Sequence, residues 1–270
     1  MKKIILFLVF AVTVSVANAW SRKCDEAVMI IANEHLTPAA AKVVKKCLGK
    51  SFTDDVHYLY ALEKEQSKTM DKKARRAAAE IHYLHLNSEL QPRDVKGKDA
   101  LKATEQALEI LRNHKSHSKA EVTTALRTVI NLMCDMHNLS KIRIQGIKHS
   151  YRDFKYIVPG GEFGSRAKEQ YNGKWSNVWN HFDGGYGFFS ANYWAYDMRI
   201  FIGDKYADYA KGTLREWVTE NGALAEKYLG IYKPKQVVAY MDRRWTTPVA
   251  YDMMIKASCR LAALLNETIK

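Results

Sequence analysis

The feature that most constrains the fold is an apolar stripe at helical spacing behind a strong helix-start signal. Ser118 and Glu121 have the spacing of a capping box, in which each side chain accepts a hydrogen bond from the other residue's backbone N–H. After them, apolar residues recur every three or four positions, the period of one helix face. They are Val122, Leu126, Val129, Met133 and Met136. The segment is therefore predicted to form a helix with one buried face.

Further helix boundaries flank this segment. Thr37-Pro38 is typical of an N-cap followed by proline at the first helical position, and Leu48-Gly49 ends that helix. Thr247-Pro248 has the same start pattern and is predicted to open a last helix. The helix before the capping box carries Leu101, Leu108 and Leu111, and the last helix carries Met253, Leu261, Leu264 and Leu265.

One segment interrupts the helical pattern. Residues 139–173 are rich in glycine and charge, and Ile142 and Ile144 alternate with polar residues. This pattern predicts a long irregular loop or a short hairpin. We therefore predict an all-α fold, with a single helical domain over residues 20–270 and one irregular or hairpin insertion.

Residues 1–19 have the three parts of a secretory signal. Two lysines near the start precede the mostly apolar residues 4–16, and Ala17-Asn18-Ala19 is a small-x-small cleavage site. The apolar run is shorter than the roughly 20 residues that span a bilayer. We expect an exported protein, periplasmic or secreted, whose mature chain begins at Trp20.

The chain is basic. Its formal net charge of +13 falls to +11 when Lys2 and Lys3 leave with the signal segment. A positive surplus favours anionic partners such as nucleic acid or phospholipid. A basic surface without a ligand explains the charge equally well, because many of these side chains fall on predicted helix faces. Examples are Lys42, Lys45, Lys46, Lys50, Lys72, Lys73, Arg75 and Arg76.

The four cysteines of an exported chain predict two disulfides. Cys24 lies near the start of one predicted helix and Cys47 near the end of the next, so an antiparallel hairpin would bring them together. Cys134 and Cys259 would then form the second bond. Four cysteines permit three connectivities, so the other pairings stay open.

Several local features occur in an order that resembles one enzyme family. Trp20 precedes an amphipathic helix, and His82-Tyr83 ends a helix farther along. Residues 131–137, Asn-Leu-Met-Cys-Asp-Met-His, are similar to His-x-x-Gly-Asp-x-His, and residues 260–266 read Arg-Leu-Ala-Ala-Leu-Leu-Asn. In this order and spacing, the chain resembles the trinuclear-zinc, single-strand-specific nucleases of the S-one/P-one type, which are cousins of the zinc-dependent phospholipases C.

The resemblance implies a helical domain with three zinc ions at the bottom of a cleft. Such ions activate a water molecule to attack a phosphodiester and stabilise the leaving oxygen. In that family the free α-amino group and the carbonyl of an N-terminal tryptophan bind zinc. Signal cleavage directly before Trp20 would therefore matter for the chemistry.

Carried over position by position, most of the family's zinc ligands are replaced. Trp20, His82 and Asp135 match the ligand pattern, and Asp25 stands in place of a histidine. Tyr60 and Asn180 replace aspartates, while Asn131, Lys141 and Ser176 replace histidines. A protonated lysine has no lone pair for a metal. The resemblance thus implies either no cofactor or a single weak zinc site formed by Trp20, Asp25, His82 and Asp135.

The replacements also balance charge. A carboxylate inside an apolar helix is costly to bury without a partner, so Asp135 is expected to pair with Lys141 or with the mature N-terminal ammonium. Lys141 would then occupy the place of a lost zinc ion. His57 and His181 are open as substitute ligands, and His137 fits a hydrogen-bonded structural histidine.

Three functions stay open. The first is a catalytically impaired relative of the nucleases that binds an anionic ligand, a nucleotide or single-stranded nucleic acid, in the old cleft. The second is an active zinc-dependent endonuclease or phosphodiesterase with a reduced metal site. The third is a non-enzymatic module whose aromatic segment, residues 175–201, meets a protein or glycan partner. The replaced ligands favour the first.

Overall fold

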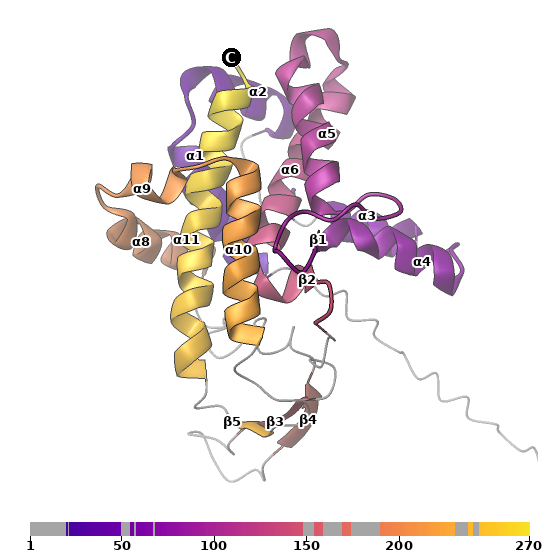
Figure 1. Ribbon diagram of the computed structural model, residues 1–270. Helices are drawn as coiled ribbons and strands as arrows, with labels where there is room; N and C mark the ends of the chain where they lie inside the picture. The colour runs from indigo at the N-terminus through magenta and orange to yellow at the C-terminus, as the bar shows by residue number, and fades with distance from the viewer. Residues whose placement is uncertain are drawn as a thin grey trace, which may run out of the picture.

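The computed structural model is predominantly helical, which confirms the all-α prediction (Figure 1). It describes residues 20, 22–49, 55–56, 58–66, 68–147, 154–158, 169–173, 190–229, 237–239 and 243–270. The predicted signal segment, residues 1–19, lies outside this part of the chain. No helix among the described residues combines the length and the apolar composition needed to cross a bilayer.

Four long helices supply most of the core. They are α1 (Arg22–Glu34), α5 (Ala100–Arg112), α6 (Lys119–His137) and α11 (Arg243–Thr268). α6 packs against the other three. The predicted capping box of Ser118 and Glu121 starts it, and every residue of the predicted apolar stripe from Val122 to Met136 is at most 3% exposed. The helix with the strongest sequence signal is thus the centre of the fold.

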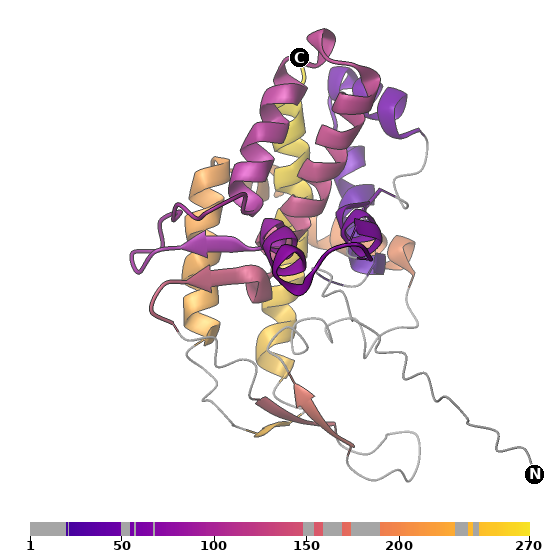
Figure 2. The ribbon, with the colours of Figure 1, turned by 90° about the vertical axis from the view of Figure 1, so that its right-hand side faces the viewer.

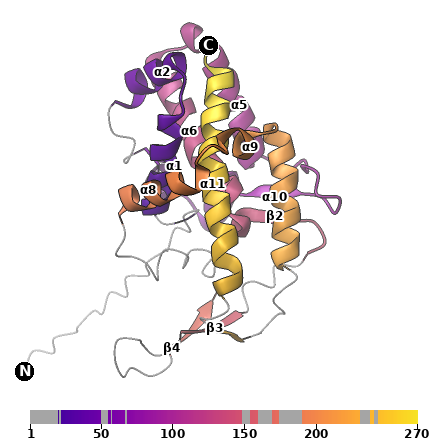
Figure 3. The ribbon, with the colours of Figure 1, turned by 90° about the vertical axis from the view of Figure 1, so that its left-hand side faces the viewer.

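Further helices surround this core. α2 (Pro38–Leu48) begins at the Thr37 cap and ends at Gly49, as predicted, where a φ of +82° favours glycine. Figure 3 shows α8 (Ala191–Ile202) crossing α1, and α9 (Tyr206–Ala210) against α11. α10 (Leu214–Leu229) packs beside the C-terminal end of α6.

The segments that carry the candidate site residues lie beside the C-terminal half of α6. α3 (Tyr58–Gln66) packs directly on α6, and α4 (Lys72–Ala79) leads into the 3₁₀ turn η1 (Glu80–His82). A second 3₁₀ turn, η2 (His114–Ser116), connects α5 to α6, and a third, η3 (Leu139–Lys141), follows α6. Of these elements, α3, η1 and η3 bring side chains from distant parts of the sequence to one face of α6.

Two small sheets complete the fold. β1 (Leu84–Leu86) pairs in parallel with β2 (Ile142–Ile144), and Figure 2 shows the two strands side by side. β3 (Phe154–Val158) pairs antiparallel with β4 (Glu169–Gly173) and parallel with β5 (Val237–Ala239). A hairpin therefore does occur within the predicted insertion. The alternation at Ile142 and Ile144, however, reflects pairing with a strand far upstream.

The start of the last helix was predicted wrongly. α11 begins at Arg243, and Pro248 lies inside it rather than at its first position. A proline inside a helix costs roughly 3 kcal/mol because it removes a backbone donor and crowds the preceding turn. Most apolar residues between Ala250 and Ile269 are buried, and their packing offsets that cost.

The predicted disulfides are not formed in the structure. The expected Cys24–Cys47 pairing assumed that α1 and α2 fold back on each other as an antiparallel hairpin. Instead, α2 packs on α6 and α11, and Cys24 is fully buried on the inner face of α1. Cys134 on α6 and Cys259 on α11 are also buried without a bond between them.

The capping box gives a test of the central helix. Replacing Ser118 with alanine removes the side-chain oxygen that accepts a hydrogen bond from the Glu121 backbone N–H. We expect the free energy of unfolding to fall by about 1 kcal/mol, measured by urea denaturation of the mature protein. Ser116→Ala, at a neighbouring exposed position, is the matched control and should change it by less than about 0.5 kcal/mol. Equal effects of the two variants would contradict the capping role.

Candidate functional site

Asp135 is the centre of a cluster of buried polar side chains. Its side chain has no exposed surface. The hydroxyl of Tyr60 from α3 donates to Asp135 Oδ1, and Nδ1 of His82 from η1 lies 2.7 Å from Oδ2. The ammonium of Lys141 from η3 lies 3.9 Å from Oδ1. We call these four residues the Asp135 cluster.

Two aromatic rings of the cluster stack and fix each other's orientation. The rings of Tyr60 and His82 have centroids 4.1 Å apart and an interplanar angle of 12°. Burial raises the pKa of Tyr60 well above its ordinary value, and the charge and hydrogen bond of Asp135 raise it further. The hydroxyl therefore keeps its proton and serves as a donor to the carboxylate.

His82 lies between two carboxylates. Besides Asp135, Oε2 of Glu63 lies 3.3 Å from its Nε2. Burial by itself lowers the pKa of His82, but the attraction and hydrogen bond of Asp135 and the contact with Glu63 outweigh it, so the pKa lies above 6.5. The two carboxylates thus favour the protonated form of a ring that the resemblance expected to be a metal ligand.

The second cation of the cluster is enclosed by aromatic rings. The side chain of Lys141 is 3% exposed, and its ammonium lies 5.2 Å from the ring centroids of both Tyr60 and Tyr83. Arg143 covers the ring of Tyr83 at 3.6 Å. Cation–π attraction of this kind adds to the attraction of Asp135 and helps to offset the lost hydration of the ammonium.

An ion-paired group continues the cluster outward along β1 and β2. Arg143 Nη1 donates to both carboxylate oxygens of Glu80, at 2.8 and 2.7 Å, and His85 Nε2 lies 2.8 Å from the same carboxylate. The hydrogen bond with His85, together with the pairing with Arg143, lowers the pKa of Glu80 to about 2. This group ties η1 to the paired strands and so positions His82.

Asn131 holds the start of α3 in place. It lies one helical turn before Asp135, so both side chains project from the same face of α6. Its Nδ2 donates to the backbone carbonyls of Asp55 at 2.8 Å and Arg127 at 2.9 Å, and its Oδ1 accepts from the backbone N–H of Leu59 at 3.1 Å. An asparagine can do this because it offers a donor and an acceptor at once.

Two further predicted positions, Asp25 on α1 and Trp20 just before it, are buried. Asp25 is buried, and its carboxylate accepts a hydrogen bond from the Cys134 thiol, whose pKa burial and this contact raise well above the ordinary value. The charge of Asp25 also contributes to the raised pKa of Tyr60. Trp20 is 2% exposed, and its indole Nε1 has no hydrogen-bond acceptor among the described residues.

Most of the predicted site residues that the structure describes therefore lie together around Asp135. Contacts or electrostatic coupling connect Asp25, Tyr60, His82, Asp135 and Lys141, and Asn131 supports them. Ser176, Asn180, His57 and His181 lie outside the described residues. Within the described part of the chain, no three histidine, cysteine or acidic side chains are grouped so that they could hold a metal ion.

Sequence reasoning missed several residues of this region. Glu63 follows Tyr60 by three positions and so shares its helix face, which is a signal that could have revealed it. Tyr83 was noted as part of the His82-Tyr83 motif, but its contacts with Lys141 and Arg143 carry no signal, because only the parallel pairing of β1 with β2 places η1 and η3 side by side. Their roles follow from tertiary structure.

His137 has the structural role that was predicted for it. Its Nδ1 lies 2.8 Å from the backbone carbonyl of Met133, and Nη1 of Arg260 lies 3.3 Å from its Nε2. Arg260 in turn pairs with Glu220, and Asn221 Nδ2 donates to the Met136 carbonyl at 2.9 Å. These bonds connect α6 to α10 and α11.

In comparisons with known proteins, no protein-family model and no curated protein matches this chain.

Tyr60 provides a direct test of the cluster. Tyr60→Phe keeps the ring that stacks on His82 but removes the hydroxyl that donates to the buried Asp135 carboxylate. We expect the free energy of unfolding to fall by about 2–3 kcal/mol, because a buried charged acceptor loses a donor. Tyr58→Phe on the same helix is the control. Its ring packs under Arg127, no hydrogen bond of its hydroxyl is present in the described region, and its effect should be small.

The two buried histidines predict a dependence of stability on pH. Burial and the charge of Arg260 lower the pKa of His137 from 6.5 to about 3. Between these values the unfolded chain binds a proton that the folded chain does not, so stability should fall as the pH drops below 6.5. His82 acts in the opposite direction. Its raised pKa stabilises the folded state below pH 6.5, and this stabilisation is lost as the pH rises above that value.

The measurement is the free energy of unfolding from pH 4 to 7 for the wild type and His137→Gln. The variant should be less stable at pH 7, yet lose less stability on acidification, with a difference on the order of a few kcal/mol. Parallel pH profiles would show that His137 does not titrate abnormally.

Proposed function

We propose that this protein is an exported, nuclease-like scaffold in which a hydrogen-bonded and ion-paired core replaces a metal centre. It acts by binding an anionic ligand, and it does not hydrolyse phosphodiesters. The observation that carries the proposal is the environment of Asp135. The residue that matches a bridging metal ligand uses both carboxylate oxygens for protein partners, Tyr60 and His82.

Charge compensation supports this proposal. A carboxylate that bridged metal ions would need other cations once the metals were gone, since an unpaired buried charge costs several kcal/mol. Lys141 and the His82 imidazolium supply those cations, and Tyr60 replaces a charged ligand by a neutral donor. Each substitution thus serves the same local balance of charge.

The chemistry of hydrolysis also argues for a binding role. Metal-assisted phosphodiester cleavage requires an open coordination position where a water molecule loses a proton. At the Asp135 cluster, the carboxylate is engaged by a tyrosine hydroxyl, an imidazolium and an ammonium, all of which are proton donors. None of these groups is a general base or a nucleophile in the protonation state that its surroundings favour.

The surroundings of Lys141 bear on where the anionic ligand binds. Its ammonium faces Asp135 and two tyrosine rings, and its side chain is 3% exposed. These contacts support a role for Lys141 within the protein core. The positive charge available to a ligand is then carried by the outer surface of a chain whose predicted mature net charge is +11.

Metal content and activity test the proposal together. Mature protein beginning at Trp20 should contain less than one equivalent of zinc after dialysis, and a chelator should leave its melting temperature unchanged. It should not cleave single-stranded DNA in excess zinc. Lys141→His should not restore cleavage, because Ser176 and Asn180 still stand where the family has metal ligands. Two or more tightly bound zinc ions, or zinc-dependent cleavage, would instead establish the reduced-site phosphodiesterase.

A further inference from the structure

A basic hollow lies at the N-terminal end of α6, between α2 and the turn that joins α5 to α6, whereas Asp135 lies near the C-terminal end of the same helix. Its volume is about 480 Å³, within the range of ligand-binding pockets. His114 and His117 from the turn contribute to its lining. Five lysines surround it, and we call this hollow the basic groove: Lys42, Lys46, Lys115, Lys119 and Lys270.

In the described part of the chain, the charges of these lysines are not paired. None of the five forms an ion pair with a carboxylate among the described residues, and no aspartate or glutamate of the described chain lines the groove. Elsewhere, Lys68, Lys102 and Lys256 pair with neighbouring carboxylates. The groove therefore concentrates uncompensated positive charge around a concave surface, which raises the local concentration of anions.

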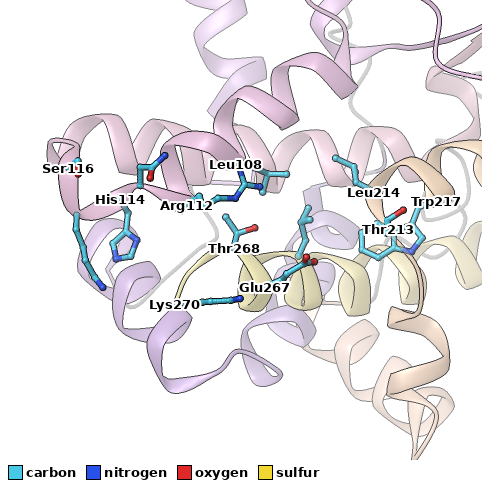
Figure 4. Close-up of a pocket in the computed structure, with 13 residues that line it drawn as sticks. Leu108, Arg112, His114, Ser116, Thr213, Leu214, Trp217, Glu267, Thr268 and Lys270 are labelled. Carbon is cyan, nitrogen blue, oxygen red and sulfur yellow. The ribbon is translucent and has the colours of Figure 1, made fainter.

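The groove continues into a second hollow of about 670 Å³ that shares His114, Lys115 and Lys270 with it. Figure 4 shows this hollow between the end of α5, which carries Arg112, and the end of α11, which carries Glu267 and Thr268. The two hollows together form an extended path. A ligand longer than one sugar or phosphate unit can follow it, with its most strongly charged part in the basic groove.

The side chains of the groove indicate the class of anion. Lysines act as separate point charges that suit sulfate or phosphate groups without demanding bidentate geometry. Sites for single-stranded nucleic acid combine a basic groove with aromatic side chains on which bases stack. No Phe, Tyr or Trp of the described chain lines the basic groove itself. Trp217 lines the second hollow, but it is only 3% exposed and its indole N–H donates to the Lys211 carbonyl, so its ring is not presented for stacking. The chemistry thus favours an anionic polymer without bases.

We infer that the basic groove binds a sulfated polysaccharide. This inference rests on the proposed function, since it names the class and the binding place of the anionic ligand. Sulfate groups repeated along a flexible sugar chain match several exposed lysines spread over a groove. Their binding releases counterions and should weaken steeply as salt rises, as it does for other polyanions.

The experiment compares two variants with the same net charge. The groove variant is Lys42→Gln/Lys46→Gln/Lys119→Gln. The control is Lys72→Gln/Lys73→Gln/Lys205→Gln, which removes three exposed lysines that do not line the groove. The probes are a short heparin oligosaccharide, a single-stranded oligonucleotide of equal formal charge, and inorganic tripolyphosphate. Affinity is measured by calorimetry over a series of salt concentrations, with circular dichroism to confirm folding.

We expect the heparin oligosaccharide to bind most tightly. The groove variant should lose about tenfold or more in affinity and show a shallower salt dependence, and the control should lose less than about twofold. Tighter binding of the oligonucleotide or of tripolyphosphate would overturn the polysaccharide assignment. Equal losses in both variants would overturn the groove as the site while leaving anion binding intact. Zinc-dependent cleavage together with groove binding would overturn the proposed function alone.

Discussion

Asp135 lies inside α6 with no exposed surface, and a carboxylate in that position needs partners that offset its lost hydration. Those partners come from α3, η1 and η3, which are separated in sequence by dozens of residues. Each must be held close to α6 for the charge to be tolerated. The contacts of Asp135 with its three partners therefore stabilise the packing of these short elements and the pairing of β1 with β2. The same packing is what keeps the partners within reach of the carboxylate.

The groups that surround the Asp135 carboxylate are all proton donors. Tyr60 contributes a hydroxyl whose raised pKa keeps its proton, and Asp135 and Glu63 on either side of His82 raise its pKa and so favour its protonated form. Such a network is stabilising only when every member is satisfied, since a buried polar group without a partner costs energy. This requirement explains why Tyr60, His82 and Lys141 must all be present around Asp135.

Cations have two distinct roles in this protein. Lys141, Arg143 and Arg260 are buried or half-buried and are matched by carboxylates or aromatic rings, so they stabilise the fold. The lysines of the basic groove are exposed and lack such partners in the described structure, so their charge is available to a ligand. Net charge alone does not separate these roles, although it is the quantity visible in the composition.

The sequence by itself determined the helices that carry their own signals. The Ser118–Glu121 capping box and the Thr37-Pro38 start are local arrangements, and the stripe from Val122 to Met136 is a period that one helix face requires. The candidate residues Tyr60, His82, Asp135 and Lys141 were found by resemblance, and most of the described ones do converge.

Only the tertiary structure decided how these residues interact. Tyr83 and Arg143 meet through the parallel pairing of β1 with β2, which leaves no local trace in the sequence. The expected disulfides are absent from the described structure. Their prediction depended on the direction in which α2 leaves α1, and packing on α6 and α11 sets that direction. Local hydrogen bonds and periodicity are encoded along the chain, whereas the matching of buried charges depends on distances across it.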